Sequence, residues 1–457
     1  MRNHGTNHPD PAYPKTMHEQ YTWSWIEAQV AQTIEVWNAG AAHSAHAGPR
    51  YTPNQQQERE KAYDQGLRAV EREAKRAPRT KAQRLNTQDR IVASFARFSA
   101  TALDLQPETV KLLTDDFLPV GTTLARWARQ FDAGLSMADI IQACRNAWTA
   151  CGLQPLLGER IGITPSILGY SLLYPYSDNY LDREDVSPAA KLRFCDRFRG
   201  RLRGERLTAQ DDRETALWTL VNLIEDQFPR ARFPQVFDCL LAIHRAQEES
   251  IAQLRSGNQY ADAEVLQMSC AKGGSSVLAD ACLAHGCLTA DESRFSFEWG
   301  VLLQLGDDLQ DVREDMRRGS VTLFTRRATQ GEPLDTLLIQ LLNFSEYVAG
   351  RMDQLPNGTQ MLKNLLRMSW RSLIIGAIAN SHEFFSSSFL QEAERWSPFR
   401  FEFLRARNQR LTSRHGLYAT LFDAFLEARG EGGALPPPDY EKLSYPGAES
   451  AAVGTSA

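Results

Sequence analysis

Helical periodicity is the property of this sequence that most constrains its fold. From about Thr87 onward, apolar residues recur at three- and four-residue spacing, whereas the alternation of a half-buried strand is almost absent. Gly, Pro, Asn and Asp fall between these stretches, and Ser136 stands where one stretch needs an N-cap. We therefore expect an all-α protein, built as a single large antiparallel helical bundle. The helices predicted from this spacing are 22–39, 118–131, 137–150, 189–204, 211–228, 233–256, 261–285, 292–318, 333–355, 361–386 and 399–427.

Composition divides the chain into four predicted segments. Residues 1–20, rich in Asn, His and Pro, and residues 431–457, rich in Gly, Pro, Ser and Ala, are expected to be disordered. Between them, 91–430 is expected to form the main helical domain, preceded by an N-terminal helical extension over 21–90. Much of that extension is highly charged, which predicts an exposed helix that breaks at Pro78.

Charge and cysteine content exclude several classes of protein. With 51 Lys and Arg against 56 Asp and Glu, the net charge of −5 gives no reason to expect a nucleic-acid partner. No apolar run reaches the roughly 18 residues of a membrane span, and the N-terminus lacks the apolar core of a signal peptide. The seven cysteines form no CxxC pair, which favours reduced thiols over disulfides or zinc ligands. We expect a cytoplasmic protein without a transmembrane segment, and the sequence leaves a homodimer open.

A stripe of carboxylates late in the chain is the strongest indication of function. Asp307, Asp311 and Asp315 recur every four residues, so a helix would place them on one face, with Asp308 beside them. Like charges at this spacing destabilise a helix by roughly 0.2–0.5 kcal/mol per pair, and none of the three has a Lys or Arg four residues further on. The residues just before the stripe are densely apolar, which predicts a buried helix. Buried carboxylates need a positive partner, and Mg²⁺, which prefers oxygen ligands, suits them.

A smaller acidic cluster precedes this stripe in the sequence. Asp178 and Asp182 are four residues apart, so they would share one helix face. Alone, this spacing is typical of a solvated helix end, but in an all-helical chain with the later stripe it indicates two facing carboxylate clusters. Pro175 lies just before the cluster, and a helix would have to begin or kink there.

Together, these motifs resemble the class I isoprenoid (terpene) synthase superfamily. The segment Gly306-Asp-Asp-Leu-Gln-Asp-Val-Arg-Glu-Asp315 is similar to the second aspartate-rich motif of prenyl diphosphate synthases, whose core is DDxxD. Asp178-Asn-Tyr-Leu-Asp182 looks like the first motif in its DxxxD form, with asparagine where ordinary prenyl synthases have a second aspartate. Lys272, followed by Gly-Gly-Ser-Ser, looks like a lysine-bearing helix segment of the same superfamily. The nearest branches are the squalene/phytoene synthases and the large-terpene cyclases.

The resemblance implies a fold, a cofactor and a set of roles. It implies an isoprenoid synthase-type bundle that binds Mg²⁺, as a cluster of two or three ions, and a prenyl diphosphate substrate. The implied metal ligands are Asp178, Asp182, Asp307, Asp308, Asp311 and Asp315. The implied catalytic residues are Asp178, Asp182, Asp307 and Asp311, and the implied diphosphate contacts are Lys272, Arg317 and Arg318. Aromatic residues lead into both motifs, and most of them are expected to belong to the core, with only a minority lining the cavity; they are Tyr170, Tyr174, Tyr176, Phe295, Phe297 and Trp299.

The expected reaction is Mg²⁺-dependent ionisation of a prenyl diphosphate, with release of diphosphate and cyclisation of the allylic cation. Two related fates of the cation stay open, namely head-to-head coupling of the squalene/phytoene synthase kind and chain elongation. A catalytically inactive helical scaffold is the alternative from another class, and it would predict gaps in one of the aspartate clusters. A His/Asp phosphohydrolase is disfavoured, because none of the nine histidines is followed by Asp.

Overall fold

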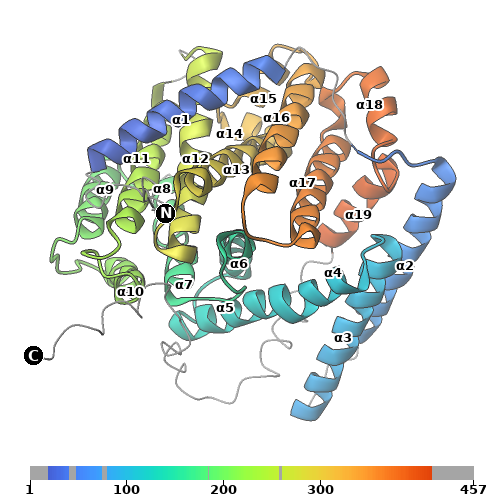
Figure 1. Ribbon diagram of the computed structural model, residues 1–457, viewed down its shortest axis with the longest axis horizontal. Helices are drawn as coiled ribbons and strands as arrows, with labels where there is room; N and C mark the ends of the chain where they lie inside the picture. The colour runs from blue at the N-terminus through green and yellow to red at the C-terminus, as the bar shows by residue number, and fades with distance from the viewer. Residues whose placement is uncertain (1–18, 41–47, 75–79, 184, 257–259, 414–457) are drawn as a thin grey trace, which may run out of the picture.

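The computed structural model describes residues 19–40, 48–74, 80–183, 185–256 and 260–413 of the chain (Figure 1). Every regular element within these ranges is a helix, which confirms the all-α prediction. The tails predicted at 1–20 and 431–457 lie outside the described residues, apart from residues 19 and 20, and so does Pro78.

The helices run in chain order from α1 to α19, with three short η elements between them. Those in the first half of the chain are α1 (Glu19–Ala39), α2 (Pro53–Ala74), α3 (Lys81–Ala102), α4 (Pro107–Lys111), η2 (Leu112–Phe117), α5 (Leu118–Phe131), α6 (Met137–Leu153), η3 (Gln154–Leu157), α7 (Pro165–Ser171), α8 (Asp178–Asp182), α9 (Pro188–Leu202) and α10 (Asp212–Gln227). Those in the second half are α11 (Pro234–Ser256), α12 (Asp262–His285), α13 (Ala290–Gln310), α14 (Val312–Arg318), α15 (Leu323–Thr329), α16 (Asp335–Gln354), α17 (Gln360–Asn380), η4 (His382–Phe384), α18 (Ser387–Glu394) and α19 (Phe401–Ser413).

Helices α12 and α13 form the centre of the bundle (Figure 1). Helix α12 packs against α11, α6 and α1 as well as α13, and α13 packs against α16 and α17. Both central helices are buried over most of their length, with Phe295 and Phe297 among the largest fully buried side chains. The core of the protein therefore lies along this helix pair.

Glycines set the close approach of the two central helices. A Cβ atom added at Gly300 of α13 would lie 2.2 Å from the carbonyl oxygen of Gly273 on α12. A Cβ atom at Gly274 would lie 2.3 Å from the ring of Phe297. The small residues that follow Lys272 thus serve helix packing, and they bring Lys272 close to the acidic end of α13.

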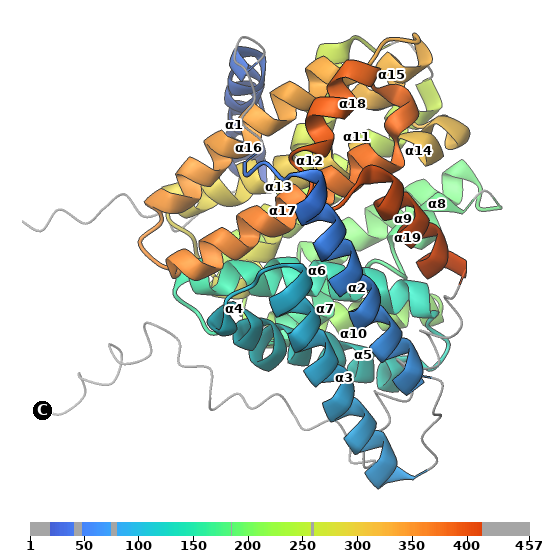
Figure 2. The same ribbon diagram turned by 90° about the vertical axis from the view of Figure 1, so that its right-hand side faces the viewer.

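The N-terminal helices attach to the bundle in two different ways. Helix α1 lies across the bundle and buries Trp23, Ile26 and Trp37 against it, as predicted for 22–39 (Figures 1 and 2). Helices α2 and α3 pack against each other as a separate pair. The buried Glu60 of α2 connects this pair to the C-terminal part of the chain, because it accepts hydrogen bonds from Arg400, just before α19. Helix α3 continues without a break across residue 90, where the sequence places the start of the main domain.

The acidic end of α13 differs from the prediction of one helix over 292–318. Helix α13 ends at Gln310, and Asp311, with φ −96° and ψ 6°, separates it from α14. The backbone nevertheless keeps two helical hydrogen bonds across the break, from Asp311 N to Asp307 O at 2.8 Å and from Asp315 N to Asp311 O at 2.9 Å. The spacing of the three aspartates is therefore preserved although the helix is interrupted.

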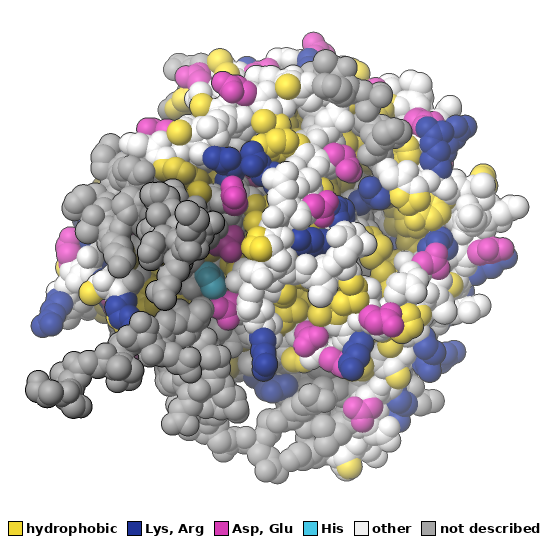
Figure 3. Space-filling view, in the orientation of Figure 1, with side chains coloured by type: hydrophobic (Ala, Val, Ile, Leu, Met, Phe, Trp, Pro, Cys, Tyr) yellow, Lys and Arg dark blue, Asp and Glu magenta, His cyan; other side chains and the backbone are white. Residues whose placement is uncertain are grey.

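Other features of the sequence are reproduced in the described residues. Ser136 caps α6, accepting from Asp139 N while the Asp139 carboxylate accepts from Ser136 N. All seven cysteines are free thiols, and only Cys287 is exposed. No helix in the described ranges is long and apolar enough to cross a membrane. Figure 3 shows basic and acidic side chains interspersed over one face, in keeping with the small net charge.

Candidate active site

A cavity of about 480 Å³ lies among helices α6, α7, α9, α11, α12, α13 and α14. Its volume is within the range of small-molecule sites, roughly 300–1,000 Å³. Both acidic clusters contribute to its lining, Asp178 from α8 and Asp307, Asp308, Asp311 and Asp315 from the end of α13 and from α14. The fold thus brings together carboxylates that are more than a hundred residues apart in the sequence.

The first cluster is held in place by its neighbours on other helices. Asp178 accepts hydrogen bonds from Ser177 Oγ at 2.9 Å and from Gln247 Nε2 of α11 at 2.8 Å. Asn179 donates from Nδ2 to Asp139 Oδ1 at 2.8 Å. This asparagine therefore anchors α8 to the start of α6. Asp182 is the last residue of α8, and its side chain lies outside the described part of the structure.

Pro175 does not prevent the chain from turning into the first cluster. Ser177 N donates to Leu173 O at 2.9 Å and Asp178 N donates to Tyr174 O at 3.0 Å, so the turn continues through the proline. Helix α8 starts directly after this turn. The local geometry that the sequence left open is thus a helical turn that leads into a very short helix.

Asp308 is the most deeply buried carboxylate of the second cluster. One of its oxygens accepts from Gln304 Nε2 at 2.8 Å and the other from Ser269 Oγ of α12 at 3.0 Å. Burial raises the pKa of Asp308 to about 6, although both hydrogen bonds and the charge of Lys272 oppose this shift. Because Asp308 is buried and one of its hydrogen bonds reaches α12, it is suited to fix α13 against α12.

Asp307, Asp311 and Asp315 are more open to the cavity than Asp308. Asp307 forms an ion pair with Arg145 of α6 at 3.3 Å. Asp311 is exposed and has no hydrogen-bonding or ion-pairing partner among the residues the structure describes. Burial raises the pKa of Asp307 and of Asp315, and the charge of Asp311 raises both further. The three carboxylates thus carry negative charge that the described protein groups only partly neutralise.

The cations predicted to contact diphosphate are not equivalent. Lys272 lines the cavity and forms no hydrogen bond or ion pair with a described residue, while its charge lowers the pKa values of Asp307 and Asp315. Arg318 also lines the cavity, with its Nε 3.0 Å from Glu314 Oε1. Arg317 does not line the cavity, because its guanidinium turns to the other oxygen of Glu314. The geometry favours Lys272 and Arg318 over Arg317 as diphosphate contacts.

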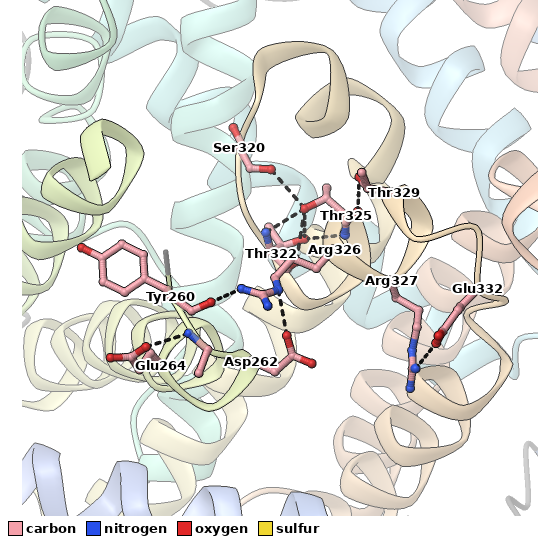
Figure 4. A network of polar contacts seen from close by, with 11 residues as sticks. Tyr260, Asp262, Glu264, Ser320, Thr322, Thr325, Arg326, Arg327, Thr329 and Glu332 are labelled. Atoms are coloured by element: carbon pink, nitrogen blue, oxygen red, sulfur yellow. Dashed lines mark hydrogen bonds and ion pairs between the residues drawn. The ribbon is translucent and has the colours of Figure 1, made fainter. Parts of the chain in front are cut away.

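The segment between α14 and α15 contributes Ser320 and Thr322 to the lining of the cavity. Figure 4 shows both residues in a polar network with Thr325. Thr322 caps α15, accepting from Thr325 N at 3.2 Å. Arg326 ties this region to the start of α12, because its guanidinium donates to Tyr260 O and pairs with Asp262 at 2.7 Å. The segment is therefore attached to the same helix that carries Lys272.

Few of the predicted aromatic residues line the cavity. Tyr170 and Tyr174 do so, whereas Tyr176 donates from its hydroxyl to Asp132. Phe295 and Phe297 belong to the core, as most aromatic residues at helical spacing are expected to do. Trp299 lines a second, apolar cavity of about 490 Å³ between α5, α6, α13 and α17.

Several residues of the site escaped the sequence analysis. Phe198 and Leu202 of α9, together with Leu240 and Ile243 of α11, form an apolar wall of the acidic cavity. The helices themselves were predicted, but the spacing does not show which of their faces meets a cavity. Arg145 carries no distinguishing signal either, since its partner lies 162 residues further along the chain.

The residues present fit Mg²⁺ as a bound ion. Their donors are carboxylate oxygens, the type that Mg²⁺ prefers. The negative charge of the aspartates in the cavity is only partly neutralised by the described basic residues. No three of the aspartates bring oxygens within 4.8 Å of one another, so the described residues form no closed cage. This also suits Mg²⁺, which usually binds through one or two carboxylates and completes its shell with water and substrate phosphates.

Comparison with protein-family models, curated proteins and solved structures found no match to this chain. The chemistry of the cavity is therefore the basis for assigning a function.

Proposed function

We propose that this protein is a class I terpene synthase, which ionises a prenyl diphosphate with Mg²⁺, releases diphosphate and cyclises the allylic cation. One observation carries the proposal. A single cavity contains Asp178, four further aspartates from the end of α13 and from α14, and Lys272, an ammonium with no ion-pairing partner among the described residues. Anionic ligands for a divalent ion and a free cation for an anion are what binding of a metal diphosphate requires.

The roles divide between the two sides of the cluster. Asp178 on one side and Asp307, Asp311 and Asp315 on the other would hold Mg²⁺ through carboxylate oxygens. Lys272 would bind the diphosphate oxygens directly, and we assign Arg318 a supporting contact. Asp308 acts through its hydrogen bonds to Gln304 and Ser269, which keep the stripe facing the cavity.

Ionisation requires negative charge to be stabilised on the leaving group. When bound, Mg²⁺ supplies Lewis-acid stabilisation of the departing diphosphate. The bond between carbon and oxygen breaks heterolytically, so both electrons leave with diphosphate and the carbon becomes an allylic cation. The wall of Phe198, Leu240 and Ile243 excludes water from that cation, and the rings of Tyr170 and Tyr174 can stabilise it through their π faces.

The direct test is incubation of the purified protein with Mg²⁺ and prenyl diphosphates from C10 to C35. Diphosphate release is measured by a coupled assay, and organic products are identified by gas chromatography with mass spectrometry. We expect release from at least one substrate, loss of release on chelation by EDTA, and recovery when Mg²⁺ is added back. A folded protein that releases no diphosphate from any of these substrates would contradict the proposal.

The same experiment separates the alternatives. Cyclisation gives a hydrocarbon or alcohol with the carbon number of the substrate. Head-to-head coupling gives twice that number, and elongation with isopentenyl diphosphate adds five carbons. A scaffold protein releases no diphosphate under any condition.

A further inference from the structure

His244 of α11 lines the acidic cavity, and the carbonyl beside it fixes its tautomer. The imidazole Nε2 lies 3.0 Å from the backbone oxygen of Cys195 on α9. A carbonyl oxygen can only accept a hydrogen bond, so Nε2 carries the hydrogen. Nδ1 is then the nitrogen with a free lone pair, and His244 is the only imidazole among the described residues that line this cavity.

Charged groups behind the ring act on its pKa in opposite directions. The carboxylate of Glu248, one helical turn further along α11, lies 3.7 Å from His244 Nε2. Arg199 of α9 holds Glu248 by hydrogen bonds to both of its oxygens, and Asp196 pairs with the same guanidinium at 3.0 Å. Burial lowers the pKa of His244 and the charge of Arg199 lowers it further, so the ring is neutral near pH 7, while the charges of Glu248 and Asp196 oppose this shift.

A metal site is the competing interpretation of this cluster. Ligand atoms of Cys195, His244 and Glu248 lie within 4.8 Å of one another. However, Arg199 already pairs with Glu248, so a metal ion would have to displace the guanidinium from that carboxylate. With Nε2 held by a carbonyl, the cluster favours a proton over a metal ion.

His244 lies on α11 between residues of the apolar wall and Gln247, which contacts the acidic cluster. Gln247, three residues further along α11, also lines the cavity and donates to Asp178. Leu240 and Ile243 on the same helix form part of the apolar wall, and the ring of Phe198 meets His244 edge to face at 5.1 Å. The imidazole thus lies beside the wall that would enclose the hydrocarbon.

We propose that His244 is the base that ends the reaction, taking at Nδ1 a proton from the carbon next to the cationic centre. The C–H bond breaks, its electron pair forms the carbon–carbon double bond of the product, and a new N–H bond forms on the imidazole. The proton leaves with diphosphate or water when the cavity opens. The inference rests on the proposed function, because it requires the carbocation that ionisation produces.

The test compares His244→Gln with the wild-type enzyme. The glutamine amide retains a donor for the Cys195 carbonyl but offers no basic nitrogen. We expect diphosphate release within about threefold of wild type, because ionisation needs no base, and a tenfold or larger fall in the alkene share of the products in favour of water-captured alcohol. The matched control is His285→Gln, whose imidazole pairs with Glu159 at 3.0 Å outside this cavity and whose loss should leave the products unchanged.

A second readout needs only the wild-type enzyme, and covers the case in which His244→Gln does not fold. The alkene-to-alcohol ratio should be constant down to about pH 6.5 and fall only at lower pH, because burial lowers the pKa of His244 and protonation of the ring then removes the acceptor. An unchanged product ratio in folded His244→Gln, a pH-independent ratio in wild type, or an alcohol as the sole wild-type product would each overturn the inference. Absence of diphosphate release from wild type would instead overturn the proposed function.

Discussion

Replacing Gly300 by alanine should force apart the two central helices. The new Cβ atom would lie 2.2 Å from the carbonyl oxygen of Gly273, and 2.9 Å from Val277 Cβ. Ordinary van der Waals contact begins near 3.4 Å, so the backbones must separate by about 1 Å. A backbone oxygen cannot rotate away as the end of a side chain can, and overpacking of a well-packed core typically costs about 1–3 kcal/mol.

The magnitude follows from two opposing contributions. Alanine is favoured over glycine in a helix interior by about 0.5–1 kcal/mol. We take the clash at the upper end of its range, so the net loss in the free energy of unfolding is about 2 kcal/mol. Gly350→Ala is the matched control, because this glycine lies in helix α16 with no atom within 4 Å of an added Cβ, and it should gain about 0.5–1 kcal/mol.

Urea unfolding followed by circular dichroism at 222 nm measures both variants against wild type. Gly300→Ala should unfold at lower urea than wild type, and Gly350→Ala at the same or higher urea. If Gly300→Ala proved as stable as Gly350→Ala, the helices would not meet at this glycine and the position inferred for Lys272 would lose its basis.

Three further predictions concern charged groups. Burial raises the pKa of Asp280 in the folded state well above 3.8. The stability that this carboxyl contributes is therefore fully present below pH 3.8 and is lost as the pH rises through the pKa of Asp280 in the folded state. Asp280→Asn should accordingly stabilise the protein more at pH 8 than at pH 4, as measured by thermal unfolding. Lys272→Met should weaken binding of Mg²⁺–diphosphate about tenfold by calorimetry, since a hydrogen bond to a charged group contributes about 1.5–3 kcal/mol, whereas Arg317→Met should change it by less than about twofold. Arg145→Ala should leave the melting temperature nearly unchanged, because exposed ion pairs contribute about 0–1 kcal/mol, but should tighten Mg²⁺ binding by removing the cation that competes for Asp307; weaker binding would contradict that role.

Local patterns predicted the helices well, because burial of one helix face leaves a periodic trace in the sequence. The cap at Ser136 is also a local signal, and the small residues after Lys272 serve the close packing of α12 against α13. The break at Asp311 was not predicted, since the backbone hydrogen bonds on both sides of it retain helical spacing. A turn that preserves spacing leaves no interruption in a periodic pattern.

The sequence indicated the acidic residues of the cavity and two of its cations, Lys272 and Arg318, but not the groups that tertiary packing adds to them. Repeated aspartates in an apolar setting are visible in the sequence because their charge is costly to bury. Arg145 and His244 are not, because their importance depends on partners brought near by tertiary packing, Asp307 in one case and Cys195 in the other. The apolar wall from α9 and α11 was missed for the same reason.

The measurement that tests the central claim most directly is the rate of Mg²⁺-dependent diphosphate release by Asp311→Asn and by Glu314→Gln. Asp311 lines the cavity without a partner among the described residues, whereas Glu314, three residues further on, pairs with Arg317 and Arg318 and does not line it. Neither substitution removes a buried contact, so both variants should fold. If the carboxylate cluster binds Mg²⁺, Asp311→Asn should lower the rate of diphosphate release by about 100-fold or more, and Glu314→Gln should change that rate by less than about twofold. Undiminished release by Asp311→Asn, or equal losses in both variants, would contradict a metal-binding role for the cluster.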